Sequence, residues 1–393
     1  MGLIGTWIVA KKWVILAFFA LACAFEGFAS GQAQYLIAND DVPLVSGVSF
    51  FTVGANGLIA LKQQVQTNGA GISGGYFATS RVAVLDTASQ QCAFVSNALT
   101  GNIVGIDINT LVVGGSASGS DTDSGAANGI GLVLNDQYLY AGYTASNTIG
   151  TFQLQSGCSL TFVNDVPATG LQSGFVDGMA INGNMMVVTY DDGSIESFDI
   201  SSGTPVSNGD EQNSTGYLNS QGASYPNSVE ITADGHYAVF GDTSTLARVE
   251  VSNLQSGKLE KTTDYLLSRT INSSNILLSP DETLLYISNT QGDTITAAAF
   301  DKTTGKPTAA CNSQRLKGYS SSWSYLSQMA LASNTGNGGT IYVAEFGGTS
   351  GIAMVGVSVA GGKCTLTELP GSPVVDPNSG GLLSIAAFPP RSF

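Results

Sequence analysis

Short apolar segments alternate with polar turns along nearly the whole chain, and one phrase recurs seven times. Each copy is an apolar strand, a short polar turn and a second apolar strand. The copies open at Gln34, Gln91, Gln137, Asn184, His236, Thr283 and Gly339. Neighbouring copies start between 46 and 57 residues apart. Regular self-similarity at this spacing indicates repeated supersecondary units rather than several unrelated domains.

Each repeat divides into four strands. The third repeat reads NGIGLVL from Asn128, then QYLYAGY, NTIGTFQL and CSLTFV, with turn residues between the segments. Units of about 40–50 residues with four strands are typical of β-propeller blades. The first two segments are apolar without interruption, which predicts inner strands buried on both faces by the neighbouring blades.

The first-strand phrase also occurs seven times, but its copies are shifted by one unit. They stand at Arg81, Gly129, Gly178, Ser228, Asn275, Met329 and Leu382. The unit that opens at Gln34 therefore has no first strand before it, and a spare copy lies at the C-terminus. We predict an all-β, seven-bladed β-propeller with four antiparallel strands per blade. Residues 382–388 supply the inner strand of blade 1, which closes the ring and removes its exposed edges.

The first 33 residues have the pattern of an export signal. Lys11 and Lys12 precede a short apolar run, and small residues follow up to Ala33. The run is shorter than the roughly 20 residues of a membrane span. We therefore expect a signal peptide at 1–33, no stable membrane insertion after its removal, and one propeller domain at 34–393. Lipid attachment at Cys23 is the less favoured alternative, because Ala20 replaces the large aliphatic residue usual three positions earlier.

The charge balance excludes some partners. The net charge is −15, from 29 acidic and 14 basic residues. A nucleic-acid backbone would be repelled, and apart from Lys11 and Lys12 no basic cluster is available for an anionic membrane surface. We expect a small-molecule, sugar-derived or protein ligand and a monomeric chain.

Four cysteines remain after removal of the signal segment, an even number that suits disulfides in an exported protein. The propeller geometry selects among the three possible pairings. Cys92 and Cys158 fall on turns of the same face in neighbouring blades 2 and 3, and Cys311 and Cys364 do so in blades 6 and 7. We predict the bridges Cys92–Cys158 and Cys311–Cys364.

Ligands of propellers usually bind at the mouth of the central channel, on the face built from second-to-third turns and inter-blade links. The residues that close the second strands are polar or phenolic: Asn39, Asn97, Tyr143, Tyr190, Asp242, Asn289 and Glu345. Asn and Asp also favour the turn that follows, so turn formation is the competing interpretation. The first six, with Asn227 from an inter-blade link, are candidate ligand-binding residues.

The candidate catalytic residues are Asp177, Glu345 and Arg81. Asp177 lies in an apolar setting where burial would raise its pKa, and Arg81 could hold an anion or form an ion pair. The single histidine, His236, begins a second strand on the other face, which argues against a Ser-His-Asp triad. No metal motif is present, and we expect no cofactor.

Several phrases resemble the lactonase-like propellers, which include propeller-type 6-phosphogluconolactonases and proteins with YVTN repeats. They are SPDETLLYISN from Ser279, SGCSLTFVNDVP from Ser156, SGKLEKTTDYLL from Ser256 and GKCTLTELPGSPVVDP from Gly362. The resemblance implies a seven-bladed ring and ring-opening hydrolysis of a sugar lactone. It also implies a Pro-His or Arg-His pair at links into first strands, where this chain has Arg81, Asn128, Asp177, Asn227 and Asn275 instead.

Two functions follow from these observations. The first is an exported binding or scaffold propeller that uses its channel mouth for a ligand. The second is a lactone hydrolase in which Asp177 or Glu345 activates water and Arg81 stabilises the oxyanion.

Overall fold

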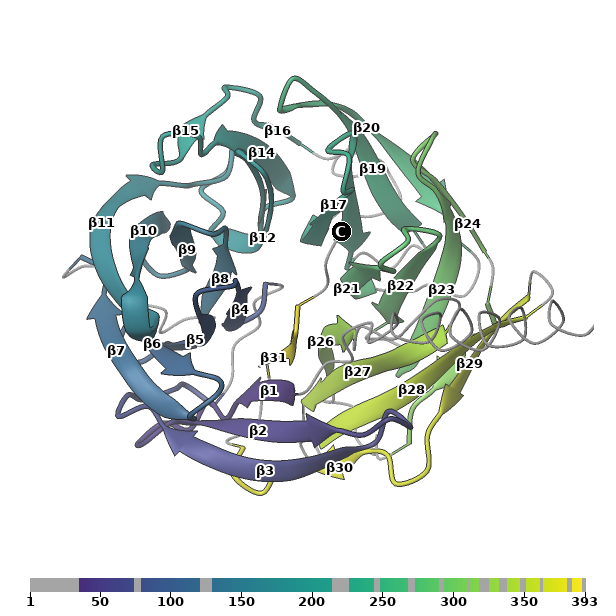
Figure 1. Ribbon diagram of the computed structural model, residues 1–393. Helices are drawn as coiled ribbons and strands as arrows, with labels where there is room; N and C mark the ends of the chain where they lie inside the picture. The colour runs from purple at the N-terminus through teal and green to yellow at the C-terminus, as the bar shows by residue number, and fades with distance from the viewer. Residues whose placement is uncertain are drawn as a thin grey trace, which may run out of the picture.

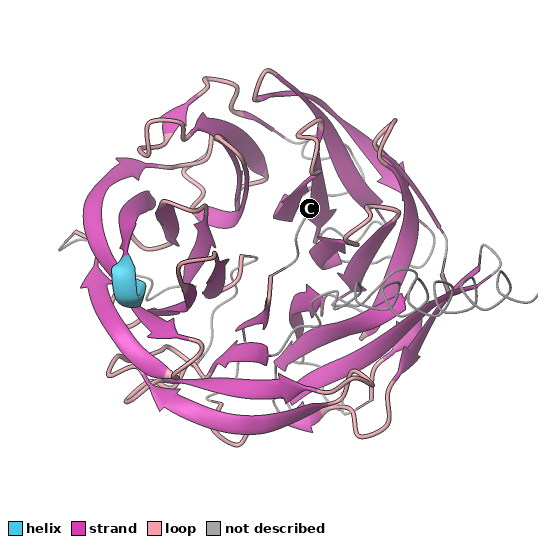
Figure 2. Ribbon diagram, viewed as in Figure 1, coloured by secondary structure: helices cyan, strands magenta, loops and turns pink. Residues whose placement is uncertain are grey.

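The computed structural model describes the chain in thirteen segments: 35–73, 79–120, 129–213, 226–243, 248–267, 273–289, 293–309, 311–317, 325–331, 338–346, 351–360, 363–379 and 384–390. The expected signal peptide at 1–33 lies outside these residues, as does Cys23. Almost every described element is a strand, arranged in a ring of seven sheets (Figures 1 and 2). The seven-bladed all-β prediction is confirmed.

The first three blades contain four strands each. Blade 1 is β31 (Ser384–Phe388), β1 (Tyr35–Asn39), β2 (Gly47–Val53) and β3 (Ile59–Gln66). Blade 2 is β4 (Val82–Asp86), β5 (Gln91–Asn97), β6 (Asn102–Asp107) and β7 (Val112–Ser118). Blade 3 is β8 (Ile130–Leu134), β9 (Tyr138–Tyr143), β10 (Thr148–Gln155) and β11 (Ser159–Pro167), with a single 3-10 turn, η1 (Ser156–Cys158), before β11.

Blades 4 and 5 continue the same order. Blade 4 is β12 (Val176–Asn182), β13 (Met185–Tyr190), β14 (Ser194–Asp199) and the short strands β15 (Val206–Ser207) and β16 (Gln212–Asn213). Blade 5 is β17 (Pro226–Ile231), β18 (Tyr237–Asp242), β19 (Arg248–Gln255) and β20 (Lys258–Leu266). The turn between β13 and β14 is an Asp-Gly hairpin turn, in which Gly193 adopts a φ of +86° that suits glycine.

Blades 6 and 7 each add a short fifth strand. Blade 6 is β21 (Ser273–Leu278), β22 (Leu284–Asn289), β23 (Thr294–Asp301), β24 (Lys306–Ala309) and β25 (Gln314–Arg315). Blade 7 is β26 (Tyr325–Leu331), β27 (Gly338–Phe346), β28 (Gly351–Ala360), β29 (Lys363–Glu368) and β30 (Val374–Val375).

The two ends of the described chain close the ring. β31 pairs antiparallel with β1, from Tyr35 opposite Phe388 to Asn39 opposite Ser384. In Figure 1 the yellow C-terminal strand lies beside the purple N-terminal strand at the inner edge of blade 1. The predicted closure by residues 382–388 is thus confirmed for the part that the structure describes.

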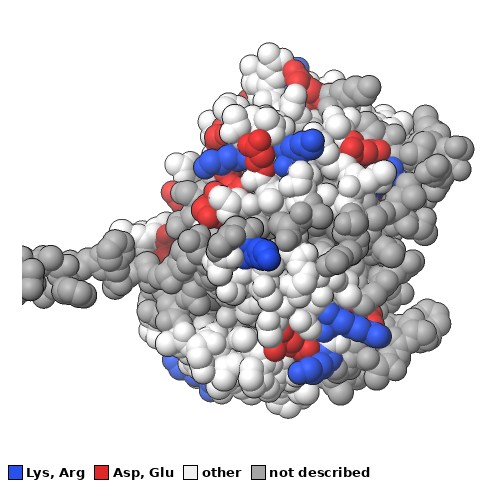
Figure 3. Space-filling view, turned by 90° about the vertical axis from the view of Figure 1, so that its right-hand side faces the viewer, with Lys and Arg blue, Asp and Glu red and all other residues white. Residues whose placement is uncertain are grey.

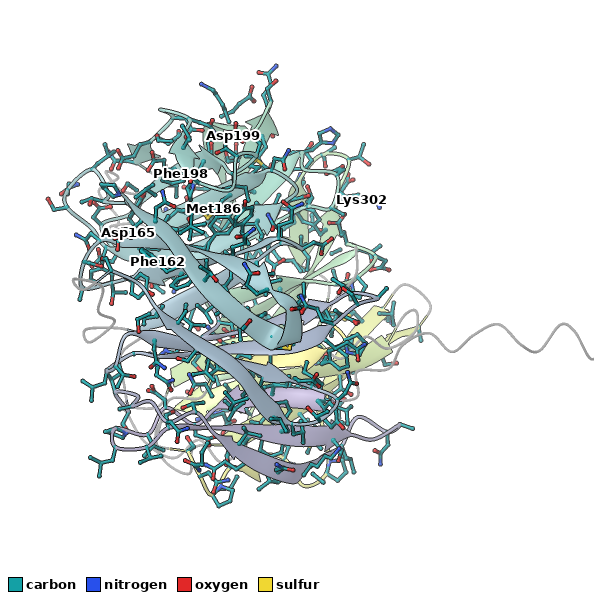
Figure 4. The ribbon with its side chains drawn as sticks, turned by 60° about the vertical axis from the view of Figure 1, so that its left-hand side comes forward. Phe162, Asp165, Met186, Phe198, Asp199 and Lys302 are labelled. Atoms are coloured by element: carbon teal, nitrogen blue, oxygen red, sulfur yellow. A yellow bond between two sulfur atoms is a disulfide. The ribbon has the colours of Figure 1, made fainter. Side chains whose placement is uncertain are left out.

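Seven apolar clusters, one between each pair of neighbouring blades, form the core. Second strands contribute to the clusters on both sides, as their uninterrupted apolar sequence predicts. In blade 4, Met186 and Phe198 belong to one of these clusters, whereas the adjoining Asp199 is exposed (Figure 4).

Both predicted disulfides are present. Cys92–Cys158 joins blade 2 to blade 3 with Cα atoms 5.6 Å apart, and Cys311–Cys364 joins blade 6 to blade 7 with Cα atoms 4.6 Å apart. None of the helices in the described part of the chain is long and apolar enough to cross a membrane.

Candidate functional site

All seven residues predicted at the ends of the second strands are buried, with exposures of at most 2%. They lie where each second strand reaches the face of the second-to-third turns. Three of those turns, 244–247, 290–292 and 347–350, lie outside the described residues. The candidate site therefore consists of the ends of the second strands and of the inter-blade links that the structure describes.

The asparagines in this set form structural hydrogen bonds, and those of Asn39 and Asn97 join neighbouring blades. Asn39 donates its amide to the carbonyl of Ser96 in the next blade at 2.8 Å, and its side-chain oxygen accepts the N–H of Asp41. Asn97 accepts a hydrogen bond from the Thr67 hydroxyl at 2.9 Å. Asn289 donates to the Thr296 hydroxyl within its own blade at 3.1 Å. These amides have structural partners, as turn and inter-blade formation require.

The two tyrosines differ in their surroundings. Tyr143 packs in the apolar cluster between blades 2 and 3. Tyr190 donates its hydroxyl to Glu196 at 2.7 Å, and Glu196 also accepts a hydrogen bond from Ser207. Burial and the nearby Glu196 carboxylate raise the pKa of Tyr190, so its hydroxyl remains a donor at neutral pH.

Two predicted charged residues form buried ion pairs. Arg81 Nη1 lies 2.7 Å from Asp41 Oδ2, and both side chains are at most 2% exposed. Gly129, with a φ of +112°, leaves room for this guanidinium: an added Cβ would lie 2.6 Å from Arg81 Nε. In blade 5, Arg248 pairs with Asp242 and, at 3.3 Å, with Asp264.

Glu345 lies in a different electrostatic environment. It is 2% exposed, and its Oε1 has no hydrogen-bond partner among the described atoms. Among the residues that the structure describes, the charged groups that act on it are the carboxylates of Glu368 and Asp293. Burial, followed by repulsion from those two groups, raises the pKa of Glu345 from 4.5 to about 8. Glu345 is therefore mainly a neutral acid at pH 7 that can accept or release a proton near that pH.

Asp177 lies at an irregularity in the inner strand of blade 4. The pairing of β12 with β13 shifts between Val176 and Gly178, so Asp177 is the extra residue of a bulge. It is 8% exposed. A Cβ on Gly178 would lie 2.1 Å from the carbonyl oxygen of Asn227, so this close approach brings the bulges of blades 4 and 5 together.

The same irregularity recurs in four successive blades. The pairing of first and second strands shifts at Pro226/Ser228 in blade 5, at Ser273/Asn275 in blade 6 and at Leu326/Met329 in blade 7. Blades 1 to 3 pair their first and second strands without a shift. The residues within the shifts are polar: Asp177, Asn227, Ser274, Ser327 and Gln328.

The link into blade 2 contacts the inner strands of blades 3 and 4. The Thr79 hydroxyl accepts the N–H of Met179 at 2.5 Å and bonds the Met179 carbonyl at 3.3 Å. The carbonyl of Ser80 accepts the N–H of Leu132 on β8 at 2.8 Å. Thr79 and Ser80 thus lie against the inner strands of blades 3 and 4.

The three predicted catalytic residues therefore occupy three different environments. Arg81 is paired with Asp41, Asp177 lies in a bulge beside Asn227, and Glu345 faces two other acids. Sequence reasoning missed the partners that decide these environments, Asp41, Asp293 and Glu368. Only Asp41, two residues beyond a second-strand end, carried a positional signal.

Two hollows in the described part of the molecule lie on the opposite face. One, of about 470 Å³, is lined by the first-to-second turns of blades 3, 4 and 5, and the other, of about 450 Å³, adjoins it. Asn184 and Ser201 line both. Their linings contain no buried carboxyl group, so we place the candidate site at the bulged strand ends instead.

The family described as "Lactonase, 7-bladed beta-propeller" matches residues 115–370, more than half of the sequence. The chain therefore belongs to the lactonase family of seven-bladed propellers, which confirms the resemblance. None of the curated proteins compared with the chain matches it.

Similar solved structures have the same fold at low identity. A provisionally assigned 6-phosphogluconolactonase from Bacteroides uniformis is 13% identical with a TM-score of 0.66, over 90% of this chain and 100% of that one. A second, from Bacteroides fragilis, is 14% identical with a TM-score of 0.63, over 90% and 98%. The periplasmic gluconolactonase of Pseudomonas aeruginosa is 13% identical with a TM-score of 0.61, over 89% and 98%.

Proposed function

We propose that this protein is an exported propeller that binds a neutral, sugar-derived small molecule at the mouth formed by blades 4 to 7. The observation that carries the proposal is the set of four successive bulges, each with a polar residue at the end of an inner strand. Bulges of this kind are frequent next to ligand sites, where they redirect a side chain and interrupt regular pairing.

The charges favour an uncharged ligand over a phosphorylated one. Arg81 and Arg248, the buried arginines of the described chain, are committed to carboxylates. The net charge of −15 would repel an anion at long range. One side of the molecule shows acidic and basic side chains close together on a largely uncharged surface, without a broad basic patch (Figure 3).

Lactone hydrolysis is the second candidate, and the state of Glu345 favours it. In its ionised form Glu345 would take a proton from water as the water oxygen bonds to the lactone carbonyl carbon. Collapse of the tetrahedral intermediate would break the ring C–O bond while Glu345 returns the proton to the ring oxygen, leaving a carboxylic acid and a hydroxyl group. Asp177 is the other acid predicted to act as the base. The reaction ranks second because Arg81, the predicted oxyanion donor, is already paired with Asp41.

One experiment distinguishes these functions. D-Glucono-δ-lactam, a neutral lactone analogue, is titrated calorimetrically into residues 34–393, and turnover of D-glucono-δ-lactone is followed by proton release against the spontaneous rate. The comparison uses the wild type, Asp177→Asn and Glu345→Gln. Pure binding predicts affinity for the lactam without turnover. Hydrolysis predicts turnover that Glu345→Gln abolishes while affinity persists, since glutamine resembles the neutral acid. Absence of both binding and turnover would refute both functions for this sugar.

Export is tested separately by N-terminal sequencing of the protein recovered from outside the cytoplasm. We expect the mature chain to begin at Gln34, after removal of residues 1–33. A lipid-modified mature chain that begins at Cys23 would contradict this, as would a full-length chain retained inside the cell.

A further inference from the structure

Two buried carboxyl groups meet where blade 7 returns to blade 1. Asp40 follows β1 and is 0% exposed, and Asp376 follows β30 and is 3% exposed. β1 pairs with the closing strand β31, and Asp376 precedes β31 in the chain. This acid pair therefore connects the segment before the closing strand to blade 1.

Neighbouring groups hold one oxygen of each acid. The Gln64 amide donates to Asp40 Oδ2 at 2.5 Å. The Ser49 hydroxyl donates to Asp376 Oδ1 at 3.3 Å, and the N–H of Asn378 donates to the same oxygen at 3.0 Å. The second oxygen of each acid, Oδ1 of Asp40 and Oδ2 of Asp376, is buried and has no hydrogen-bond partner among the described atoms.

No cation balances the acid pair within the described part of the chain, where neither carboxyl has a lysine or arginine within 4.0 Å. The charged residues beside it on β1 and β3 have other partners. Asp41 pairs with Arg81, and the exposed Lys62 donates to the Tyr35 hydroxyl. Two ionised carboxylates in contact are costly to bury without a counter-charge.

A proton between the two acids resolves this cost. It removes one of the two negative charges and gives the unpartnered oxygens a hydrogen bond. The electrostatics agree with this arrangement, because burial, followed by repulsion from Asp376, raises the pKa of Asp40 from 3.8 to about 7. The carboxyl of Asp40 therefore keeps a proton at a pH where an exposed aspartate has lost it.

We propose that Asp40 and Asp376 share one proton, and that this acid pair makes the closure of the ring depend on pH. The proton comes from solvent and returns to it, so no other ligand takes part. In acidic surroundings the shared proton fastens segment 376–379 to blade 1. When the pair loses the proton, the two carboxylates repel each other and the segment separates from blade 1 more often.

The sign of the pH effect follows from the two states of the segment. In the separated state both acids are exposed and ionise with ordinary pKa values near 4. In the closed state the pair keeps its proton up to a pH of about 7. Separation therefore releases a proton, and its equilibrium constant should rise by up to about tenfold per pH unit between about 4 and 7 and then level off.

Hydrogen exchange on residues 34–393 between a pH of about 5 and about 8 tests this proposal. The reporting amides are those of Asp40, which donates to the Gly47 carbonyl, and of Asn378. After correction for the intrinsic pH dependence of exchange, their protection should fall by up to about 100-fold between about pH 5 and 7. The Leu154 amide, which donates to the Gln137 carbonyl in blade 3, should keep its protection.

Asp376→Asn replaces the shared proton with an amide that donates at every pH, so protection of the Asp40 amide should no longer respond to pH. The matched control is Glu196→Gln, a buried acid in blade 4 whose loss should leave the wild-type response unchanged. If Asp376→Asn does not fold, carboxyl ¹³C shifts of the wild type report ionisation directly. They should show loss of one proton from the pair near pH 7.

Three results would overturn the proposal. The first is wild-type protection at Asp40 and Asn378 that stays constant between about pH 5 and 8. The second is a wild-type pH response that persists in Asp376→Asn. The third is complete ionisation of both carboxyls below a pH of about 5, where exposed aspartates ionise.

Discussion

Blades 1 to 3 and blades 4 to 7 use their polar residues in different ways. In blades 1 to 3 the first and second strands pair regularly, and Arg81 with Asp41 and Asn39 with Ser96 join neighbouring blades. In blades 4 to 7 each inner strand carries a bulge with a polar residue, and Glu345 forms no ion pair within the described part of the chain. This half also contains the ion pairs of Asp242 with Arg248 and of Asp293 with Arg315. Regular pairing of the inner strands therefore distinguishes the structural half, and the polar bulges distinguish the candidate functional half.

The largest expected effect comes from breaking the ion pair of the regular half. Arg81→Met leaves Asp41 buried without its arginine, which should cost about 3–5 kcal/mol of unfolding free energy. Chemical denaturation measures this loss. The double variant Arg81→Met/Asp41→Asn is the control and should recover part of the stability. A loss below about 1 kcal/mol would show that the pair behaves like a surface ion pair.

Glu345→Gln tests the uncompensated acid through the pH dependence of stability. Because folding raises the pKa of Glu345 from 4.5 to about 8, the folded chain binds a proton that the unfolded chain has lost. Stability therefore falls as pH rises through this window, by at most about 1.4 kcal/mol per pH unit from this group.

The unfolding free energy of the variant should fall less steeply with rising pH than that of the wild type. Above a pH of about 8 the variant should have the higher unfolding free energy. Denaturation at several pH values measures both effects. Glu196→Gln, which removes a hydrogen-bonded acid in blade 4, serves as the comparison. Parallel curves for wild type and Glu345→Gln would contradict the environment assigned to Glu345.

Thr79→Val tests the connection between the two halves. The change keeps the shape of the side chain but removes the hydroxyl that bonds Met179. Loss of these bonds in a buried position should cost about 1–2 kcal/mol. Hydrogen exchange at the Met179 amide should accelerate at the same time. Unchanged protection of that amide would mean that the link does not secure the inner strand of blade 4.

Arg315→Met should have the smallest effect. Its partner Asp293 lies 3.4 Å away, but the arginine is 75% exposed. Exposed ion pairs contribute about 0–1 kcal/mol, so denaturation should detect little change. A loss of unfolding free energy comparable to that of Arg81→Met would show that the exposed fraction of an arginine does not determine how much its ion pair stabilises this protein.

The repeat made the architecture predictable. The shifted copies of the first-strand phrase located the closing strand, and the same register placed Cys92 near Cys158 and Cys311 near Cys364. Local sequence could not predict the bulges, because they arise from the approach of adjacent inner strands, such as Gly178 against Asn227. Nor could it predict the charge partners, since Asp293, Glu345 and Glu368 come together only through the packing of blades 6 and 7.

The affinity for D-glucono-δ-lactam tests most directly the claim that the ligand binds at the mouth formed by blades 4 to 7. The comparison uses Asp177→Asn in the bulged half and Arg81→Met in the regular half. The account predicts that Asp177→Asn weakens binding by about tenfold or more, as loss of a charged hydrogen bond would. It predicts that folded Arg81→Met binds like the wild type despite its lower stability. Equal affinity of Asp177→Asn and the wild type, with weakened binding by Arg81→Met, would contradict it.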